Sequence, residues 1–202
     1  LEHAAIRRSF PGLAQAAASI ATYQLRNRAT VTGNLCNASP AADLAPALLV
    51  LGAAVGVAGP QGERVIPLPE FFAGVKRTTL ARGEIATEVR IPAPEPGLRS
   101  AFLKQQRLRG HDLAVANVAG ALVPSTGALR LAFGSCAPTP ILLVPIETKG
   151  MSADAVGEAA AASALAAARP ISDVRASAEF RRAVLPVLVR RVVAELLGGG
   201  AT

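Results

Sequence analysis

The sequence contains few of the residues from which metal centres, disulfide frameworks and aromatic cores are built. Its 202 residues include two cysteines, two histidines, one methionine and no tryptophan, and only 3% are aromatic. Cys36 and Cys136 lie far apart, so neither a disulfide framework nor a metal cluster is expected. His3 and His111 are too few for a typical zinc site. Valine, leucine, isoleucine and alanine must therefore supply the core.

Long apolar runs are also missing from the sequence. No uninterrupted apolar stretch reaches the length of about 18 residues that a membrane-spanning helix needs. The first residues are charged and lack the apolar segment of a secretory signal. These features favour a reduced, cytoplasmic setting. Because Met151 is the only methionine, we expect the chain to be a fragment, a processed product or one piece of a larger protein.

The charge is positive but dispersed. The net charge is +7, and the arginines are scattered, with only short pairs such as Arg7-Arg8 and Arg190-Arg191. A nucleic-acid-binding domain usually gathers its basic residues on one face, so nucleic-acid binding is a minor alternative here. The hydrophobic content of 51% is enough for a real core, in one large domain or two small ones.

Helical and extended patterns alternate in the first half of the chain. The apolar spacing predicts a helix over residues 11–22, and residues 24–34 are expected to be extended. A second helix is predicted over residues 43–51, with Asp43 as its N-cap and Gly52 just past its end. Four further elements are predicted: strands over 53–59, 64–67 and 84–91, the last with Ile85, Thr87, Val89 and Ile91 on one face, and a helical turn over 69–72.

A proline-rich spacer divides the two halves. Three prolines between residues 92 and 97 end the preceding strand, and we place a domain boundary there. Beyond it, short turns separate extended segments, which predicts an antiparallel meander followed by two helices. The predicted strands cover 99–108, 113–123 and 128–136, and the helices cover 153–168 and 178–197, the latter kinked by Pro186 and with an apolar stripe of Phe180, Val184, Leu188, Val192 and Leu196.

The stretch from Arg26 to Asp43 has the composition of a ligand-binding turn. Gly33 lets a backbone approach a ligand closely, and Thr30, Thr32 and Asn34 offer hydrogen-bonding groups on short side chains. A polar, glycine-containing turn before a helix often holds phosphate. The alternative is an ordinary loop with an Asp cap before a buried helix, and the residues alone leave both open.

Residues 26–35 (Arg-Asn-Arg-Ala-Thr-Val-Thr-Gly-Asn-Leu) and 38–43 (Ala-Ser-Pro-Ala-Ala-Asp) resemble the flavin-binding signature of the molybdenum hydroxylases, such as xanthine dehydrogenase and carbon monoxide dehydrogenase. The chain departs from that signature at Ala29 and Thr32, where glycine is usual. The resemblance continues through Lys104-Gln105, residues 111–114 and residues 168–182, and covers about residues 10–197.

The resemblance implies an α+β fold. Residues 1–92 would form the second lobe of a PCMH-type FAD-binding domain. Residues 98–197 would form the C-terminal domain, with a three-stranded antiparallel sheet and helices. The family's N-terminal FAD lobe, with its own pyrophosphate loop, is absent from this sequence. We therefore expect the chain alone to bind FAD poorly.

The resemblance also assigns cofactor contacts by position. Thr30, Gly33 and Asn34 would meet the pyrophosphate or ribitol of FAD, and Asn37 would extend the polar wall. Asp43 would accept hydrogen bonds from the adenosine end. The remaining contacts would be Leu80 against a flat ring and Lys104 near the flavin, although Lys104 could also be a plain surface lysine.

The function implied is that of an FAD-binding electron-transfer subunit, with no catalytic residue and no metal ligand of its own. Its expected partners are a large molybdopterin-binding subunit and a small subunit with 2Fe-2S centres. The alternative is a non-catalytic assembly module that no longer binds FAD, for which Thr32 and the absent lobe argue.

Other charged residues favour structural roles. Asp173 and Arg175 precede the last predicted helix, for which Ser177 is well placed as the N-cap. His111 beside Asp112 is only weak evidence for acid–base chemistry.

Overall fold

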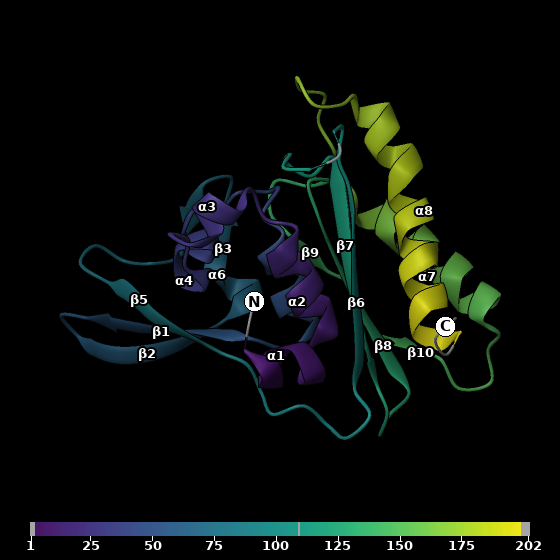
Figure 1. Ribbon diagram of the computed structural model, residues 1–202, viewed down its shortest axis with the longest axis horizontal. Coiled ribbons are helices and arrows are strands. Elements are labelled where there is room, and N and C mark those ends of the chain that lie inside the picture. The colour runs from purple at the N-terminus through teal and green to yellow at the C-terminus, as the bar shows by residue number, and fades with distance from the viewer. Residues whose placement is uncertain (1–2, 109, 199–202) are drawn as a thin grey trace.

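The computed structural model describes residues 3–108 and 110–198. Short helices and a small sheet form the N-terminal part, and a larger sheet with two long helices forms the C-terminal part (Figure 1). Within these residues, no helix is both long enough and apolar enough to cross a membrane. The α+β class expected from the sequence is confirmed.

Five short helices make up most of residues 3–50. Pro11 occupies the first turn of α2, as expected, although this helix ends at Ala18. The extended segment expected over residues 24–34 is wrong, because it contains most of α3 and most of α4. The cause is local, since Thr22 and Thr30 each accept a hydrogen bond from the backbone N–H three residues on. The helices are α1 (Ala4–Ser9), α2 (Pro11–Ala18), α3 (Tyr23–Arg26), α4 (Val31–Cys36) and α5 (Leu44–Val50).

The smaller sheet has the strand order β2-β1-β5 and carries one irregularity. A register shift on β5 leaves Thr87 outside the pairing, because Ala86 faces Val57 and Glu88 faces Gly56. The expected alternation is therefore wrong at Ile85 and Thr87 but holds at Val89 and Ile91. Ile85 is 69% exposed, while Ala86 and Val89 pack against the core. The elements here are β1 (Ala54–Gly59), β2 (Gly62–Pro67), α6 (Leu68–Phe71), β3 (Phe72–Gly74), β4 (Arg77–Thr78) and β5 (Ile85–Arg90).

The larger sheet is the predicted antiparallel meander, extended by two short strands that the sequence did not suggest. Its order is β10-β8-β7-β6, with β9 also paired to β8. Every residue of β7 is buried, because the strand lies inside the sheet and both faces are covered. The strands are β6 (Arg99–Gln105), β7 (Ala116–Val123), β8 (Ala128–Gly134), β9 (Ile141–Leu142) and β10 (Ile146–Glu147).

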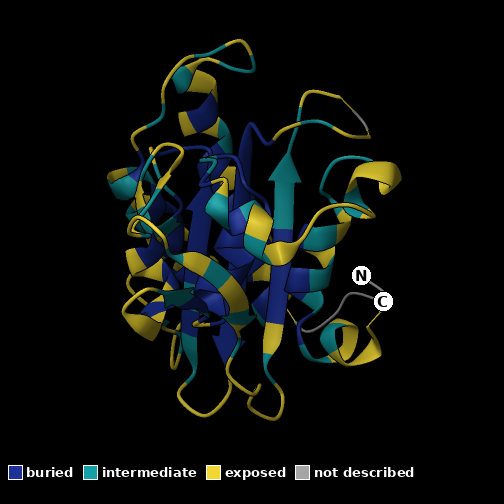
Figure 2. Ribbon diagram, turned by 90° about the vertical axis from the view of Figure 1, so that its left-hand side faces the viewer, coloured by how far each residue is buried: buried dark blue, intermediate teal, exposed yellow. Residues whose placement is uncertain are grey.

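Helices cover both faces of this sheet (Figure 1). Alternate residues contribute to two cores: Ala119 packs into the core shared with α2 and α5, and its neighbour Val118 packs into the core shared with α7 and α8. Buried residues gather on the central elements, and exposed ones gather on loops and outer helix faces (Figure 2). The sheet is thus the middle of three layers.

The two C-terminal helices, α7 (Ala153–Ala167) and α8 (Ala178–Leu197), match their predicted positions. Ser177 caps α8 as predicted, because its hydroxyl accepts a hydrogen bond from the Phe180 N–H at 3.2 Å. The predicted apolar stripe is wrong in the first turn, where Phe180 is 49% exposed. Arg181 occupies the inward position there instead and is 1% exposed.

Candidate functional site

The turn into α4 is built around a threonine cap. The Thr30 hydroxyl accepts a hydrogen bond from the Gly33 N–H at 2.9 Å. A methyl group added at Gly33 would lie 2.8 Å from that hydroxyl, so only glycine leaves the cap undisturbed. Thr32 lies inside the helix with helical backbone geometry, where a β-branched residue is not strained. Glycine is therefore needed at position 33 and not at position 32.

A pocket of about 380 Å³ opens beside this turn. The Asn34 side chain lies at its wall, and its Oδ1 atom is buried with no hydrogen-bond partner among residues 3–108 and 110–198. A buried amide oxygen without a partner is costly, so it marks a place for a donor from outside the chain. The lining residues are Ala17, Ile20, Tyr23, Arg26, Asn27, Ala29, Thr30, Val31, Asn34 and Leu44.

A second pocket of about 310 Å³ adjoins the first and shares Ile20 and Asn34 with it. Asn37 and Asp43 line this second pocket. The Asn37 Oδ1 atom already accepts a hydrogen bond from the Lys76 ammonium at 2.8 Å. The structure therefore brings Thr30, Asn34, Asn37 and Asp43 to two neighbouring hollows.

Asp43 forms a buried ion pair with Lys104. The Lys104 Nζ atom lies 2.7 Å from Asp43 Oδ2, and the two side chains are only 6% and 7% exposed. The expectation that the Asp43 side chain caps α5 is wrong, because its carboxylate turns to Lys104 and Asn117 instead. The view of Lys104 as a surface lysine is wrong as well. Burial raises the pKa of Asp43, and the hydrogen bond and charge of Lys104 act in the opposite direction.

This contact bears on the roles expected of the two residues, which stay predictions. Asp43 was assigned to the adenosine end of an extended FAD, and Lys104 was assigned to the flavin. Two side chains in direct contact cannot serve opposite ends of an extended cofactor. Asp43 and Lys104 therefore form one site.

Leu80 is placed apart from these pockets. It is partly buried and packs against the core that contains α2 and α5. Arg64 and Glu84 hold its loop, because Arg64 donates to the Thr79 carbonyl and Glu84 accepts from the Ala81 N–H. The Glu84 carboxylate also pairs with Arg64 at 2.7 Å. This hydrogen bond lowers the pKa of Glu84 to about 2.

Sequence reasoning missed Asn117. Its Nδ2 atom donates to Asp43 Oδ1 at 2.8 Å, and the residue is 0% exposed. A signal was present, because Asn117 is the single polar residue in the Ala-Asn-Val-Ala-Gly-Ala-Leu-Val sequence of β7. A polar side chain inside a buried strand requires a partner.

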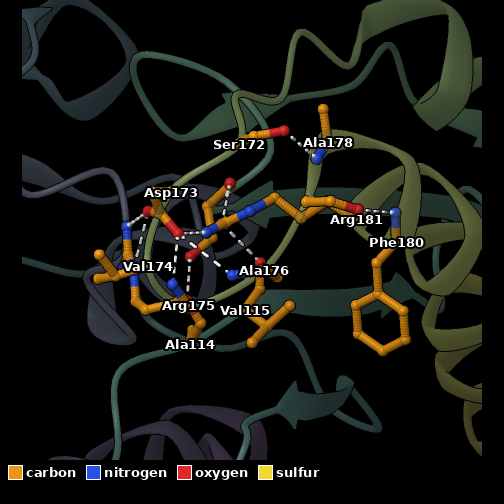
Figure 3. Close-up of polar contacts among 12 residues, drawn as sticks. Ala114, Val115, Ser172, Asp173, Val174, Arg175, Ala176, Ala178, Phe180 and Arg181 are labelled. Atoms are coloured by element: carbon orange, nitrogen blue, oxygen red, sulfur yellow. Dashed lines mark hydrogen bonds and ion pairs between the residues drawn. The ribbon is translucent and has the colours of Figure 1, made fainter.

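The other charged candidates have structural partners. Asp112 pairs with Arg107 at 3.2 Å, so no His111–Asp112 acid–base pair is needed to explain it. Asp173 accepts hydrogen bonds from Arg175 and from the buried Arg181 (Figure 3). Arg181 also donates to the carbonyls of Val115 and Ser135 at 2.8 and 2.7 Å.

Comparisons with known proteins cover nearly the whole chain. Residues 1–94 match the family described as the FAD binding domain in molybdopterin dehydrogenase. Residues 101–196 match the CO dehydrogenase flavoprotein C-terminal domain. The xanthine dehydrogenase FAD-binding subunit of Escherichia coli O157:H7 is 33% identical over 96% of this chain and 69% of its own length. The carbon monoxide dehydrogenase medium chain of Hydrogenophaga pseudoflava is 31% identical over 93% and 67%.

The fold agrees with these sequence matches. A solved structure of carbon monoxide dehydrogenase from Hydrogenophaga pseudoflava superposes with a TM-score of 0.89 at 30% identity, covering 96% of this chain and 70% of that chain. The similarity therefore extends across the sheets of both parts and the helices around them.

Proposed function

The chain belongs to the FAD-binding (medium) subunits of the molybdenum hydroxylases of the xanthine and carbon monoxide dehydrogenase type, and from this we propose that its α4 turn holds FAD for electron transfer. The observation that carries the proposal is Asn34, which lines the pocket and whose buried Oδ1 atom has no partner in the described part of the chain. A hydroxyl or amide donor of the cofactor would satisfy it.

The residues around the pocket fit such a cofactor. Thr30 and Asn34 supply polar groups on one wall, and Ile20 and Leu44 supply apolar surface on another. Gly33 is exposed in the same turn, so its backbone is accessible. A mostly apolar cleft with a few fixed polar groups is the usual form of a cofactor site.

Bound FAD would supply the electron-accepting and electron-donating chemistry. This chain would bind and orient the cofactor. Lys104 carries a positive charge that its ion pair with Asp43 keeps in place, and a fixed cation favours a nearby group that becomes more negative on reduction. No residue of this chain is needed as a general acid or base.

The finer organisation is also a proposal. We place the junction of two domains at the spacer between residues 92 and 98, with the FAD lobe before it and the C-terminal domain after it. The partners would be a large molybdopterin subunit and a small 2Fe-2S subunit, as the term "medium chain" in the relatives implies further chains. The free thiols of Cys36 and Cys136 agree with a cytoplasmic location.

The test uses the complete gene product, reconstituted with FAD and followed by its visible absorption and by the quenching of flavin fluorescence. Asn34→Ala and Thr30→Ala are each expected to weaken FAD binding by about tenfold, the effect of losing one or two hydrogen bonds. Thr126→Ala is the matched control. Its hydroxyl also accepts a backbone N–H, at 3.1 Å from Ala128, but it lies in the turn between β7 and β8.

Unchanged FAD affinity in both Asn34→Ala and Thr30→Ala would contradict the proposed site. A folded gene product that takes up no flavin at all would instead support the assembly-module alternative. One ground for that alternative is Thr32, and its helical backbone shows that a β-branched residue is not strained there.

A further inference from the structure

Asn117 occupies a position where a polar side chain is costly. It lies on the central strand β7 and is 0% exposed. Its Oδ1 atom has no hydrogen-bond partner in the described part of the molecule. An unsatisfied buried oxygen costs about 1–3 kcal/mol, so Asn117 does not simply serve stability.

The orientation of the Asn117 amide is determined by its surroundings. Its Nδ2 atom lies 2.8 Å from Asp43 Oδ1 and 3.3 Å from the Ala42 carbonyl oxygen, and both are acceptors. A flipped amide would set its own oxygen against these two acceptors, so the amide nitrogen must point toward Asp43.

The opposite strand leaves room for this arrangement. Gly134 pairs with Asn117 across β7 and β8, and a methyl group at Gly134 would lie 2.5 Å from Asn117 Oδ1. The glycine therefore allows the amide to lie over β8 with its nitrogen directed at the carboxylate.

Both oxygens of Asp43 are engaged by this chain itself. Asn117 donates to Oδ1, and Lys104 donates to Oδ2 at 2.7 Å. Lys104 also donates to the Ser19 carbonyl at 3.1 Å. An ammonium group has three N–H donors, so one remains available for a ligand. Lys104 also lines a pocket of about 490 Å³ next to Asp43.

We propose that Asn117 is a positioning residue that acts through Asp43, which serves as the counter-ion of Lys104. Asn117 fixes the carboxylate, the carboxylate fixes the ammonium, and the ammonium presents its remaining N–H to the cofactor. The last of these steps rests on the function proposed above. The first two concern this chain alone and are tested separately from it.

The test compares Asn117→Leu with the wild type in the complete gene product. Leucine has a similar volume but cannot donate to Asp43. The first readout needs no cofactor: with ¹⁵N-labelled lysine, the buried Lys104 ammonium should give a signal protected from solvent exchange, which Lys104→Arg identifies. We expect this signal to be lost in Asn117→Leu. Asn117→Ala provides the same test if the leucine variant does not fold.

The second readout is the affinity for FAD, which should fall by about tenfold, the usual effect of removing a group that orients a ligand-contacting residue. Thr148→Ala is the control. Thr148 is partly buried, and its hydroxyl donates to the Gly127 carbonyl at 2.7 Å, but it does not hydrogen-bond to Asp43, Lys104 or α2. This variant should lower Tm without changing the ammonium signal or FAD affinity.

A protected Lys104 signal in Asn117→Leu would overturn the proposal. An equal loss of FAD affinity in Asn117→Leu and Thr148→Ala would also overturn it, because general destabilisation would then explain both. If the ammonium signal is lost while FAD affinity is unchanged, the positioning role is supported and the proposed contact between Lys104 and FAD fails.

Discussion

Thr32 and Gly33 are neighbours in α4, yet a side chain has very different surroundings at the two positions. Thr32 lines an apolar pocket toward α1, α2 and β5, on a different side from Asn34. A side chain at Gly33 would meet the Thr30 hydroxyl at 2.8 Å. The residue that departs from the family pattern is therefore the one that the local geometry tolerates.

We expect Gly33→Ala to weaken FAD binding several-fold while changing Tm little. The added methyl displaces the Thr30 cap, which costs about 1 kcal/mol. The higher helix propensity of alanine stabilises the fold by about 1 kcal/mol and so offsets that loss. Thr32→Ala should leave FAD affinity at the wild-type value. Fluorescence titration with FAD and thermal unfolding measure the two effects. An equal loss of FAD affinity in Gly33→Ala and Thr32→Ala would show that FAD binding does not depend on glycine at position 33 in particular.

Among the elements, α2 and the edge strand β6 hold the site together. Three hydrogen bonds join the helix and its C-terminal end to the strand. They pair Gly12 with Ser100, Gln15 with Phe102, and Ser19 with Lys104. The helix is contacted every three or four residues and the strand every second residue, as their geometries require. The side chain of Gln15 accepts the Phe102 N–H at 2.8 Å and so covers the edge of the sheet. The position of Lys104 thus depends on how α2 is seated.

Gly12→Ala should disturb this seating. A methyl group there would lie 2.8 Å from the Ala101 backbone nitrogen, which cannot move without shifting β6. We expect a loss of about 1–3 kcal/mol in the free energy of unfolding, typical of overpacking, measured by urea denaturation.

Gly157→Ala in α7 is the matched control for that variant. Its methyl would lie 3.7 Å from Arg190 Cγ, an ordinary contact. This change should stabilise the protein by about 0.5–1 kcal/mol, because alanine is favoured over glycine inside a helix. Equal effects of the two substitutions would contradict the close contact between α2 and β6.

At the scale of the whole molecule, the parts predicted from sequence are those that depend on local patterns. Ser177 as a cap and the strands of the meander follow from short-range signals. The helices α3 and α4 were missed because four and six residues show no helical period. The pairing of Asp43 with Lys104 and Asn117 joins residues 61 and 74 positions apart, and no local pattern contains it. The cofactor contacts carried over by resemblance stay predictions.

A second long-range cluster connects the C-terminal helix to the loop between β6 and β7, whose residues His111, Asp112 and Leu113 line the pockets. Arg181 reaches from α8 to the Val115 carbonyl, just after that loop, and Arg107 in the loop donates to the Val174 carbonyl at 3.3 Å. Asp173 accepts a hydrogen bond from Arg181 at 2.8 Å (Figure 3). Partial burial alone would raise the pKa of Asp173. Hydrogen bonds from Arg175 and Ala176 and the charge of Arg181 outweigh burial and hold that pKa well below its ordinary value.

Asp173→Asn tests this connection through its dependence on pH. At pH 7 the variant should lose about 1–3 kcal/mol, because the buried Arg181 keeps only a neutral partner. A carboxylate whose pKa is lowered by folding stabilises the protein above its unfolded pKa of about 3.9, and this stabilisation disappears as the pH falls toward the folded value. Urea unfolding should therefore show the gap between wild type and variant narrowing below about pH 4. Asp154 is exposed in the first turn of α7. Asp154→Asn should differ little from the wild type in free energy of unfolding, both at pH 7 and below about pH 4. A gap for Asp173→Asn that stays constant with pH would mean that its charge does not hold α8 to the loop.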